Sequence, residues 1–136
     1  MSIKVNRSIG IQVIVTETFK QELKAELQEA SEEVQRRSDQ MELQSRRFLA
    51  EVQRTDLTQA MSARKRIEAE RRRHDAMKED IQRQIEEVDK LELESEYPRG
   101  ALESTVEISE GDDIVKKLTV SQIVVKDGIV VEIREV

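Results

Sequence analysis

Between residues 18 and 94 the apolar residues recur at steps built from threes and fours, and neither proline nor glycine interrupts them. This spacing puts apolar side chains along one stripe of an α-helix, the seam through which helices pair in a coiled coil. Charged residues make up 38% of the 136 residues and aromatic residues only 2%, which favours long helices over a large globular core. The predicted seam comprises Leu23, Leu27, Ala30, Val34, Met41, Phe48 and Val52, followed by Ala60, Ala63, Ile67, His74, Met77, Ile81, Val88 and Leu91.

Two capping signals divide this helical region. Thr18 with Gln21, and Asp56 with Gln59, have the spacing of residues that satisfy the free amides of a first helical turn. A reversal near residues 55–60 gives two antiparallel arms of roughly 36 residues, about 55 Å each. The alternative is one continuous helix of about 115 Å, with the sheet completed between subunits.

Both ends of the chain have the pattern of β-strands. Residues 3–16 alternate between apolar and other side chains, and residues 123–131 place Asp127-Gly128 between two apolar runs, which is typical of a type I′ hairpin. Because isolated hairpins are marginally stable, we expect the two ends to form one sheet. Four strands are expected near residues 9–16, 104–109, 120–126 and 129–135, with a turn at residues 110–113 that opens a short helix through Leu118.

The predicted fold class is therefore α+β. A long antiparallel helical hairpin, a coiled coil, is combined with a small antiparallel β-sheet formed by the N-terminal strand and the C-terminal hairpin. The expected layout is an N-terminal strand in residues 1–17, a helical hairpin in residues 18–96 and a C-terminal β module in residues 97–136.

The charge is distributed unevenly. The net charge is −6, yet residues 46–73 hold nine positive and four negative side chains, so the rest of the chain carries −11. This basic zone is either a solvated helix face or a binding surface for an acidic partner, such as RNA or the ribosome. Against RNA, Phe48 is the only aromatic residue in the zone, and it belongs to the predicted seam. The candidate residues for binding an anionic partner are Arg64, Lys65, Arg66, Arg71, Arg72 and Arg73.

The residues for most catalytic chemistry are missing. There is no cysteine, and His74 is the only histidine, so we expect it to pack or to hydrogen-bond between helices. The acidic turn Glu110–Asp113 lacks the spacing of a calcium-binding loop, and there is no glycine-rich phosphate loop. We therefore expect a protein that is not an enzyme, with no cofactor, no metal and no small-molecule substrate. Without a signal peptide or an apolar run of about 20 residues, we expect it in the cytoplasm, away from membranes.

The two ends of the chain resemble the YlqD family of small bacterial proteins. The resemblance rests on the strand-to-helix entry at residues 12–17, on the charged helical middle, and above all on the tail at residues 106–113 and 123–134. The family has no assigned function, so the resemblance implies no catalytic or binding residues.

The leading functional hypothesis is a non-enzymatic scaffolding protein that self-associates through its helices, as a dimer. Its basis is four leucines outside the predicted seams, since exposed apolar surface usually marks an interface. The alternatives are an RNA- or ribosome-associated factor that uses the basic zone and a holdase-like chaperone that grips clients with its arms. The four leucines are Leu43, Leu49, Leu57 and Leu93.

Overall fold

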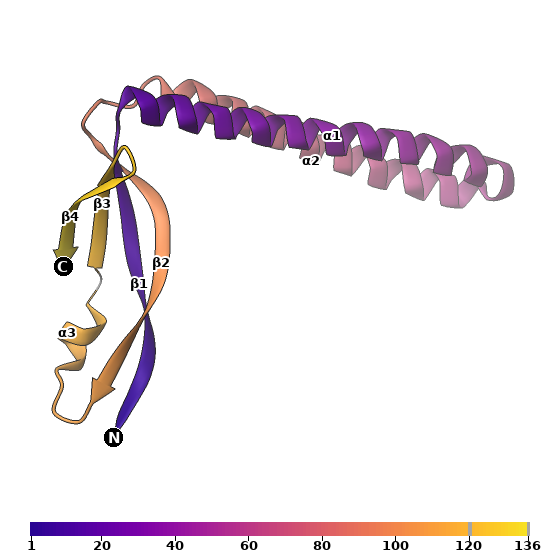
Figure 1. Cartoon of the computed structure of the whole chain (residues 1–136). Coiled ribbons are helices and arrows are strands. Elements are labelled where there is room, and N and C mark those ends of the chain that lie inside the picture. Colours follow the sequence, from indigo (N-terminus) through magenta and orange to yellow (C-terminus); the bar gives the residue numbers. More distant parts are fainter. Residues whose placement is uncertain (120, 136) are drawn as a thin grey trace. The chain divides into compact units, whose positions relative to one another are not determined.

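The computed structural model describes residues 1–119 and 121–135, and it confirms a helical hairpin combined with a four-stranded sheet (Figure 1). The chain divides into two compact units, an arm of residues 21–90 and a sheet unit of residues 1–20 and 91–136. The elements in chain order are β1 (Ser2–Ile14), α1 (Glu17–Thr55), α2 (Leu57–Val88), β2 (Glu96–Ser109), α3 (Ile114–Leu118), β3 (Ser121–Lys126) and β4 (Ile129–Glu135).

The sheet has the strand order β2-β1-β3-β4, with β1 in a central position. β1 pairs antiparallel with β2 and parallel with β3, while β3 and β4 form the predicted antiparallel hairpin. The prediction of a purely antiparallel sheet was therefore wrong at one pairing. The chain reverses direction between β1 and β2 and again between β2 and β3, so β3 can lie beside β1 only in parallel.

Two strands extend beyond their predicted limits. β1 begins at Ser2, and β2 begins at Glu96, in a segment that contains Pro98 and Gly100. Proline is tolerated there because β2 is an edge strand. A register shift opposite Ile11 and Gln12 accommodates the extra residue between Gly100 and Pro98.

The turns and caps follow local chemistry. At the hairpin turn Asp127 and Gly128 both have positive φ, 49° and 80°, as a type I′ turn requires. At the start of α1, the Thr16 hydroxyl accepts a hydrogen bond from the Phe19 amide at 3.1 Å. The predicted cap at Thr18 was therefore wrong by two residues. Thr16 follows Val15, whose backbone still pairs with Ser95 and Glu94, so the helix begins as soon as the strand ends.

Asp56 separates the two helices of the arm. Its backbone is extended, with φ −152° and ψ 104°, and its carboxylate accepts a hydrogen bond from the Gln59 amide at 3.2 Å. The predicted cap and reversal at this position are confirmed, and they need neither glycine nor proline. In Figure 1, α1 and α2 lie side by side and antiparallel from this turn.

The predicted seam holds for part of its length. Leu23, Val34 and Val52 of α1 are buried, as are Ala60, Ala63 and Val88 of α2. Ala30 and Met77 are exposed, so their placement in the seam was wrong, whereas Phe48 lies between the helices but stays 42% exposed. Around Phe48 the seam residues are the small Ser45 and Ala63, which leave a groove of about 360 Å³ between the helices. The side chains of Ser45 and Ala63 are too small to cover the ring of Phe48, which therefore stays partly exposed.

Candidate functional site at the turn of the arm

The turn end of the arm is rich in cationic side chains. Residues 46–66 hold six positive side chains and two negative ones, Glu51 and Asp56, and the Asp56 carboxylate caps α2. All six positive residues are exposed. We refer to them as the turn cations: Arg46, Arg47 and Arg54 on α1, and Arg64, Lys65 and Arg66 on α2.

The structure divides the six predicted site residues into two groups. Arg71 pairs with Glu42 on the facing helix, Arg72 with Glu68 at 3.5 Å, and Arg73 with Glu70 at 3.0 Å. Within residues 1–119 and 121–135, none of the six turn cations forms an ion pair. The predicted clusters are thus not equivalent, because only Arg64, Lys65 and Arg66 keep their donors free for another molecule.

The register of the two helices explains this division. Gln35 accepts a hydrogen bond from Lys78, and Glu42 accepts from Arg71, so seven residues along α1 match seven residues back along α2. The contacts of a coiled coil repeat about every seven residues, which is two helical turns. The next equivalent pair is therefore Leu49 with Arg64. Along α2 the cations Lys78, Arg71 and Arg64 follow one another at this spacing, but the residue opposite Arg64 is a leucine. Arg64 is therefore left without a carboxylate.

The Glu42–Arg71 contact also shifts the pKa values of its two side chains. The hydrogen bond from Arg71 lowers the pKa of Glu42, and the positive charges of Arg71 and Arg46 lower it further. The same contact raises the pKa of Arg71. Both groups are ionised at neutral pH, and the Arg71 charge is already balanced within the arm. The turn cations, which have no carboxylate partner among the described residues, therefore lie between this pair and the turn.

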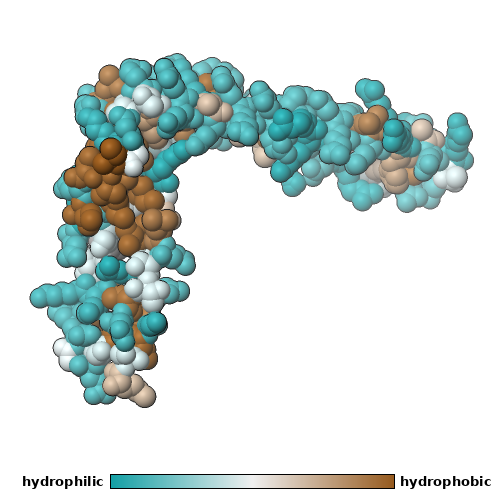
Figure 2. All heavy atoms as spheres, in the orientation of Figure 1, coloured by the Kyte–Doolittle hydropathy of each residue, from teal (hydrophilic) through white to brown (hydrophobic). Residues whose placement is uncertain are grey.

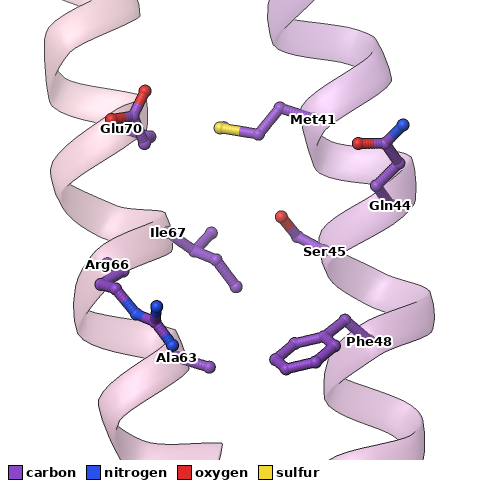
Figure 3. Close-up of a pocket in the computed structure, with 8 residues that line it drawn as sticks. All are labelled: Met41, Gln44, Ser45, Phe48, Ala63, Arg66, Ile67 and Glu70. Atoms are coloured by element: carbon purple, nitrogen blue, oxygen red, sulfur yellow. The ribbon is translucent and has the colours of Figure 1, made fainter.

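A groove adjoins the turn cations (Figure 3). It is lined by Met41, Ser45 and Phe48 of α1 and by Ala63, Ile67 and Arg66 of α2, with Gln44 and Glu70 at its edges. Figure 3 shows the Phe48 ring directed toward α2, on the same side as Ala63. Phe48 is 42% exposed, so part of an aromatic side chain is open to solvent in the groove that Arg66 also lines. The site combines a flat apolar surface with a guanidinium group.

The other predicted polar features have structural explanations. His74 is half-buried and its Nδ1 has no hydrogen-bond partner in the described chain, so it packs without an inter-helix bond from that atom. In the acidic turn, Asp112 accepts from the Ser109 amide at 2.8 Å, and Asp113 caps α3. Among the described residues no group of three or more His, Asp or Glu is placed to hold a metal ion. No described helix is long and apolar enough to span a bilayer.

Some of the residues at this site are missing from the sequence-based candidates. Arg46, Arg47 and Arg54 belong to the basic zone but not to the runs of neighbouring cations on α2. Phe48 fits the spacing of the seam and was therefore assigned to it. For the three arginines, the identifying signal is the pairing of α1 with α2, because it shows which cations meet a carboxylate.

The architecture defines a class of protein, an α+β protein in which one antiparallel helical hairpin is inserted between the strands of a four-stranded mixed sheet. The chain belongs to the YlqD family, whose model, described as YlqD protein, matches residues 3–134. It is 32% identical over 127 residues to the uncharacterised protein YlqD of Bacillus subtilis (strain 168), with 93% of this chain and 94% of that protein covered.

A solved structure shares the fold. It is the crystal structure of a protein of unknown function from Synechococcus sp. WH 8102, with a TM-score of 0.83 and 25% sequence identity. The similarity covers 99% of this chain and 96% of that one. None of these relatives has an enzymatic name.

Proposed function

We propose that the protein is a non-enzymatic, cytoplasmic RNA-binding protein that holds a single strand at the turn of its helical arm. The observation that carries this proposal is the set of six unpaired turn cations, which stands out in a chain of net charge −6. Unpaired guanidinium groups attract an anionic polymer over a range limited by salt screening. The acidic remainder of the chain disfavours binding elsewhere.

The chemistry of the turn cations favours phosphate. Five of the six are arginines, which offer a planar fork of donors to two phosphate oxygens at once. Arg66 and the exposed Phe48 lie together at the groove, so a base can stack on the ring while its phosphate meets the guanidinium. This arrangement answers the objection that the basic zone offers no ring for stacking. A single strand fits better than a duplex, because stacking needs an unpaired base.

The test is the binding of a single-stranded RNA oligonucleotide to the full chain across a salt series. Each neutralised phosphate steepens the log–log salt dependence by about 0.7. Six contacts then correspond to a slope of about −4. The double variant R64E/R66E should weaken binding at least tenfold and reduce this slope by about 1.4, because it removes two contacts.

The matched control is the double variant R72E/R73E. It makes the same change in net charge on the same helix, but at arginines that already pair with Glu68 and Glu70. We expect it to weaken binding much less than R64E/R66E. If the wild-type protein binds no RNA at low salt, or if both variants lose the same affinity, the turn is not an RNA site. Arg71 stays unchanged in both variants because it joins the two helices.

Self-association through the helices remains a second proposal with weaker support. Leu43 and Leu57 are exposed on the arm, with charged residues close to Leu43 and with Met61 as an exposed apolar neighbour of Leu57. Small groups of exposed apolar residues are normal on the surface of a monomer. A denser apolar surface lies in the sheet unit.

A further inference from the structure

One face of the sheet is apolar. The odd-numbered residues of β1 lie on it, all of them apolar except Arg7, and the strand pairing aligns these apolar residues with apolar residues of the neighbouring strands. Ile11 lies beside Ile123, which lies beside Ile133, so one row of isoleucines crosses three strands. Val13, Val125 and Val130 form the next row. We call this surface the apolar face of the sheet.

The apolar face is exposed at its outer strands. Ile133 is 71% exposed and Val130 is 53% exposed, whereas Val124, which points to the opposite face, is only 1% exposed. Within the sheet unit, α3 contacts β2 and leaves its own Ile114 and Val115 exposed. In Figure 2 hydrophobic atoms gather over the β3–β4 part of the sheet, while the arm is mostly hydrophilic.

A single sheet with an exposed apolar face needs a second layer to cover that face. Protein domains are built from at least two packed layers because each sheet must bury its apolar face against another element. The described sheet unit holds one layer of four strands. We propose that the second layer is the sheet of a second copy of this chain, with the two apolar faces packed against each other.

The area fits a dimer. Four strands about 4.8 Å apart and about 20 Å long, continued by the two-stranded part of β1 and β2, present roughly 600 Å² per copy. Two such faces bury about 1,200 Å² in total, at the lower limit for a stable protein–protein interface. The β-branched side chains of the face suit sheet-on-sheet packing with strand directions within about 30°.

The charges also favour a second copy over a charged partner. On the apolar face, the rows that cross β1, β3 and β4 hold one charged residue, Glu135 at the end of its strand, and the two-stranded part of β1 and β2 holds another, Arg7 beside Ser104. Glu132 and Arg134 alternate with Ile133 and so point to the opposite face, where Arg134 pairs with Glu96 at 2.6 Å. Across β1, β3 and β4 the face is therefore uncharged at its centre and polar at its rim, as in a homodimer interface.

β4 supplies a matched pair of positions for the test. Ile129 and Ile133 are the same residue type on the same strand, 69% and 71% exposed. Their partners on β3 are Lys126 and Ile123, so the two side chains point to opposite faces. A glutamate at either position has the same effect on net charge and nearly the same exposure in a monomer. Only I133E puts a charge into the proposed interface.

The experiment is sedimentation equilibrium of the full chain at micromolar concentration, without RNA. The wild-type protein and I129E should sediment as dimers, and I133E should dissociate at least a hundredfold more readily. I133T, which keeps a β-branched side chain suited to a strand, should weaken the dimer by a smaller factor, and it replaces I133E if circular dichroism shows that variant to be unfolded. A wild-type species at the monomer mass of 15.8 kDa overturns the proposal. So does a dimer that both glutamate variants weaken equally, or that neither weakens.

Discussion

Glu42 on α1 accepts two hydrogen bonds from the guanidinium group of Arg71 on α2, so one fork joins residues 29 apart in sequence. The fork holds the register of the helices at the point where the paired cations end and the turn cations begin. Because Arg71 lowers the pKa of Glu42, the carboxylate binds a proton less readily in the folded arm than in the unfolded chain. The contact therefore stabilises the arm in a pH-dependent manner.

E42Q should destabilise the arm at pH 7, and the difference from wild type should shrink in acid. A depressed folded pKa gives stability that is fully present above the unfolded pKa, about 4.3, and is lost as pH falls through the folded value. Thermal melts of both proteins in steps from pH 7 to pH 3 measure the difference. Glu33, whose pKa is also lowered, through Arg36, is present in both proteins and cancels. A difference that stays constant over this range would contradict the role of Glu42.

D56A should lower the stability of the arm by about 1 kcal/mol. The Asp56 carboxylate satisfies the Gln59 amide, which alanine leaves without a partner. D56N is the control, because asparagine caps helices about as well. Chemical denaturation followed by helical circular dichroism gives the two values. Equal stability of D56A and wild type would mean that the turn does not depend on this cap.

H74L should raise the unfolding midpoint of the arm. His74 has a buried nitrogen without a partner, and an unsatisfied polar atom costs about 1–3 kcal/mol. Leucine fills a similar volume in the seam without that cost. H74N, which keeps a polar side chain, should not be more stable than wild type. A lower midpoint for H74L would show that His74 makes a favourable interaction that Nδ1 alone does not reveal.

F48L should weaken the binding of single-stranded RNA, whereas F48Y should preserve it. Stacking of a base on an aromatic ring contributes about 1–3 kcal/mol, so the loss of the ring should cost at least fivefold in affinity. Because Phe48 is 42% exposed, neither change should alter folding strongly. Fluorescence anisotropy with a labelled oligonucleotide measures the affinities, and unchanged binding by F48L would leave only phosphate contacts at the turn.

The features that the sequence predicts well depend on a few neighbouring residues. Asp56 with Gln59 predicts the reversal, and Asp127-Gly128 predicts the hairpin, because each signal lies within four residues. The sequence does not decide whether Thr16 or Thr18 caps α1, since either hydroxyl can cap a helix. The end of the preceding strand decides between them.

The features that the sequence cannot predict depend on pairing over long distances. The apolar alternation would allow β3 to pair with either β1 or β2. Pairing with β1 joins strands that are more than 100 residues apart in the sequence. The basic zone is visible in composition, but its division into paired and unpaired cations requires knowing that Glu42 faces Arg71 and that Leu49 takes the equivalent place opposite Arg64. The exposure of Phe48 likewise depends on the small Ala63 across the groove.

The central position of β1 has a consequence for biosynthesis. Both strands that pair with β1 follow the arm in the chain, and 81 residues lie between Ile14 and Glu96. At about 5–20 residues per second, a ribosome needs roughly 4–16 seconds to make that segment. The arm can fold during this interval, because its two helices are neighbours in sequence, while the strand made before it still has both edges unpaired. The nascent protein therefore passes through a stage, seconds long, in which an aliphatic strand is open to chaperones or to misassembly with other nascent chains.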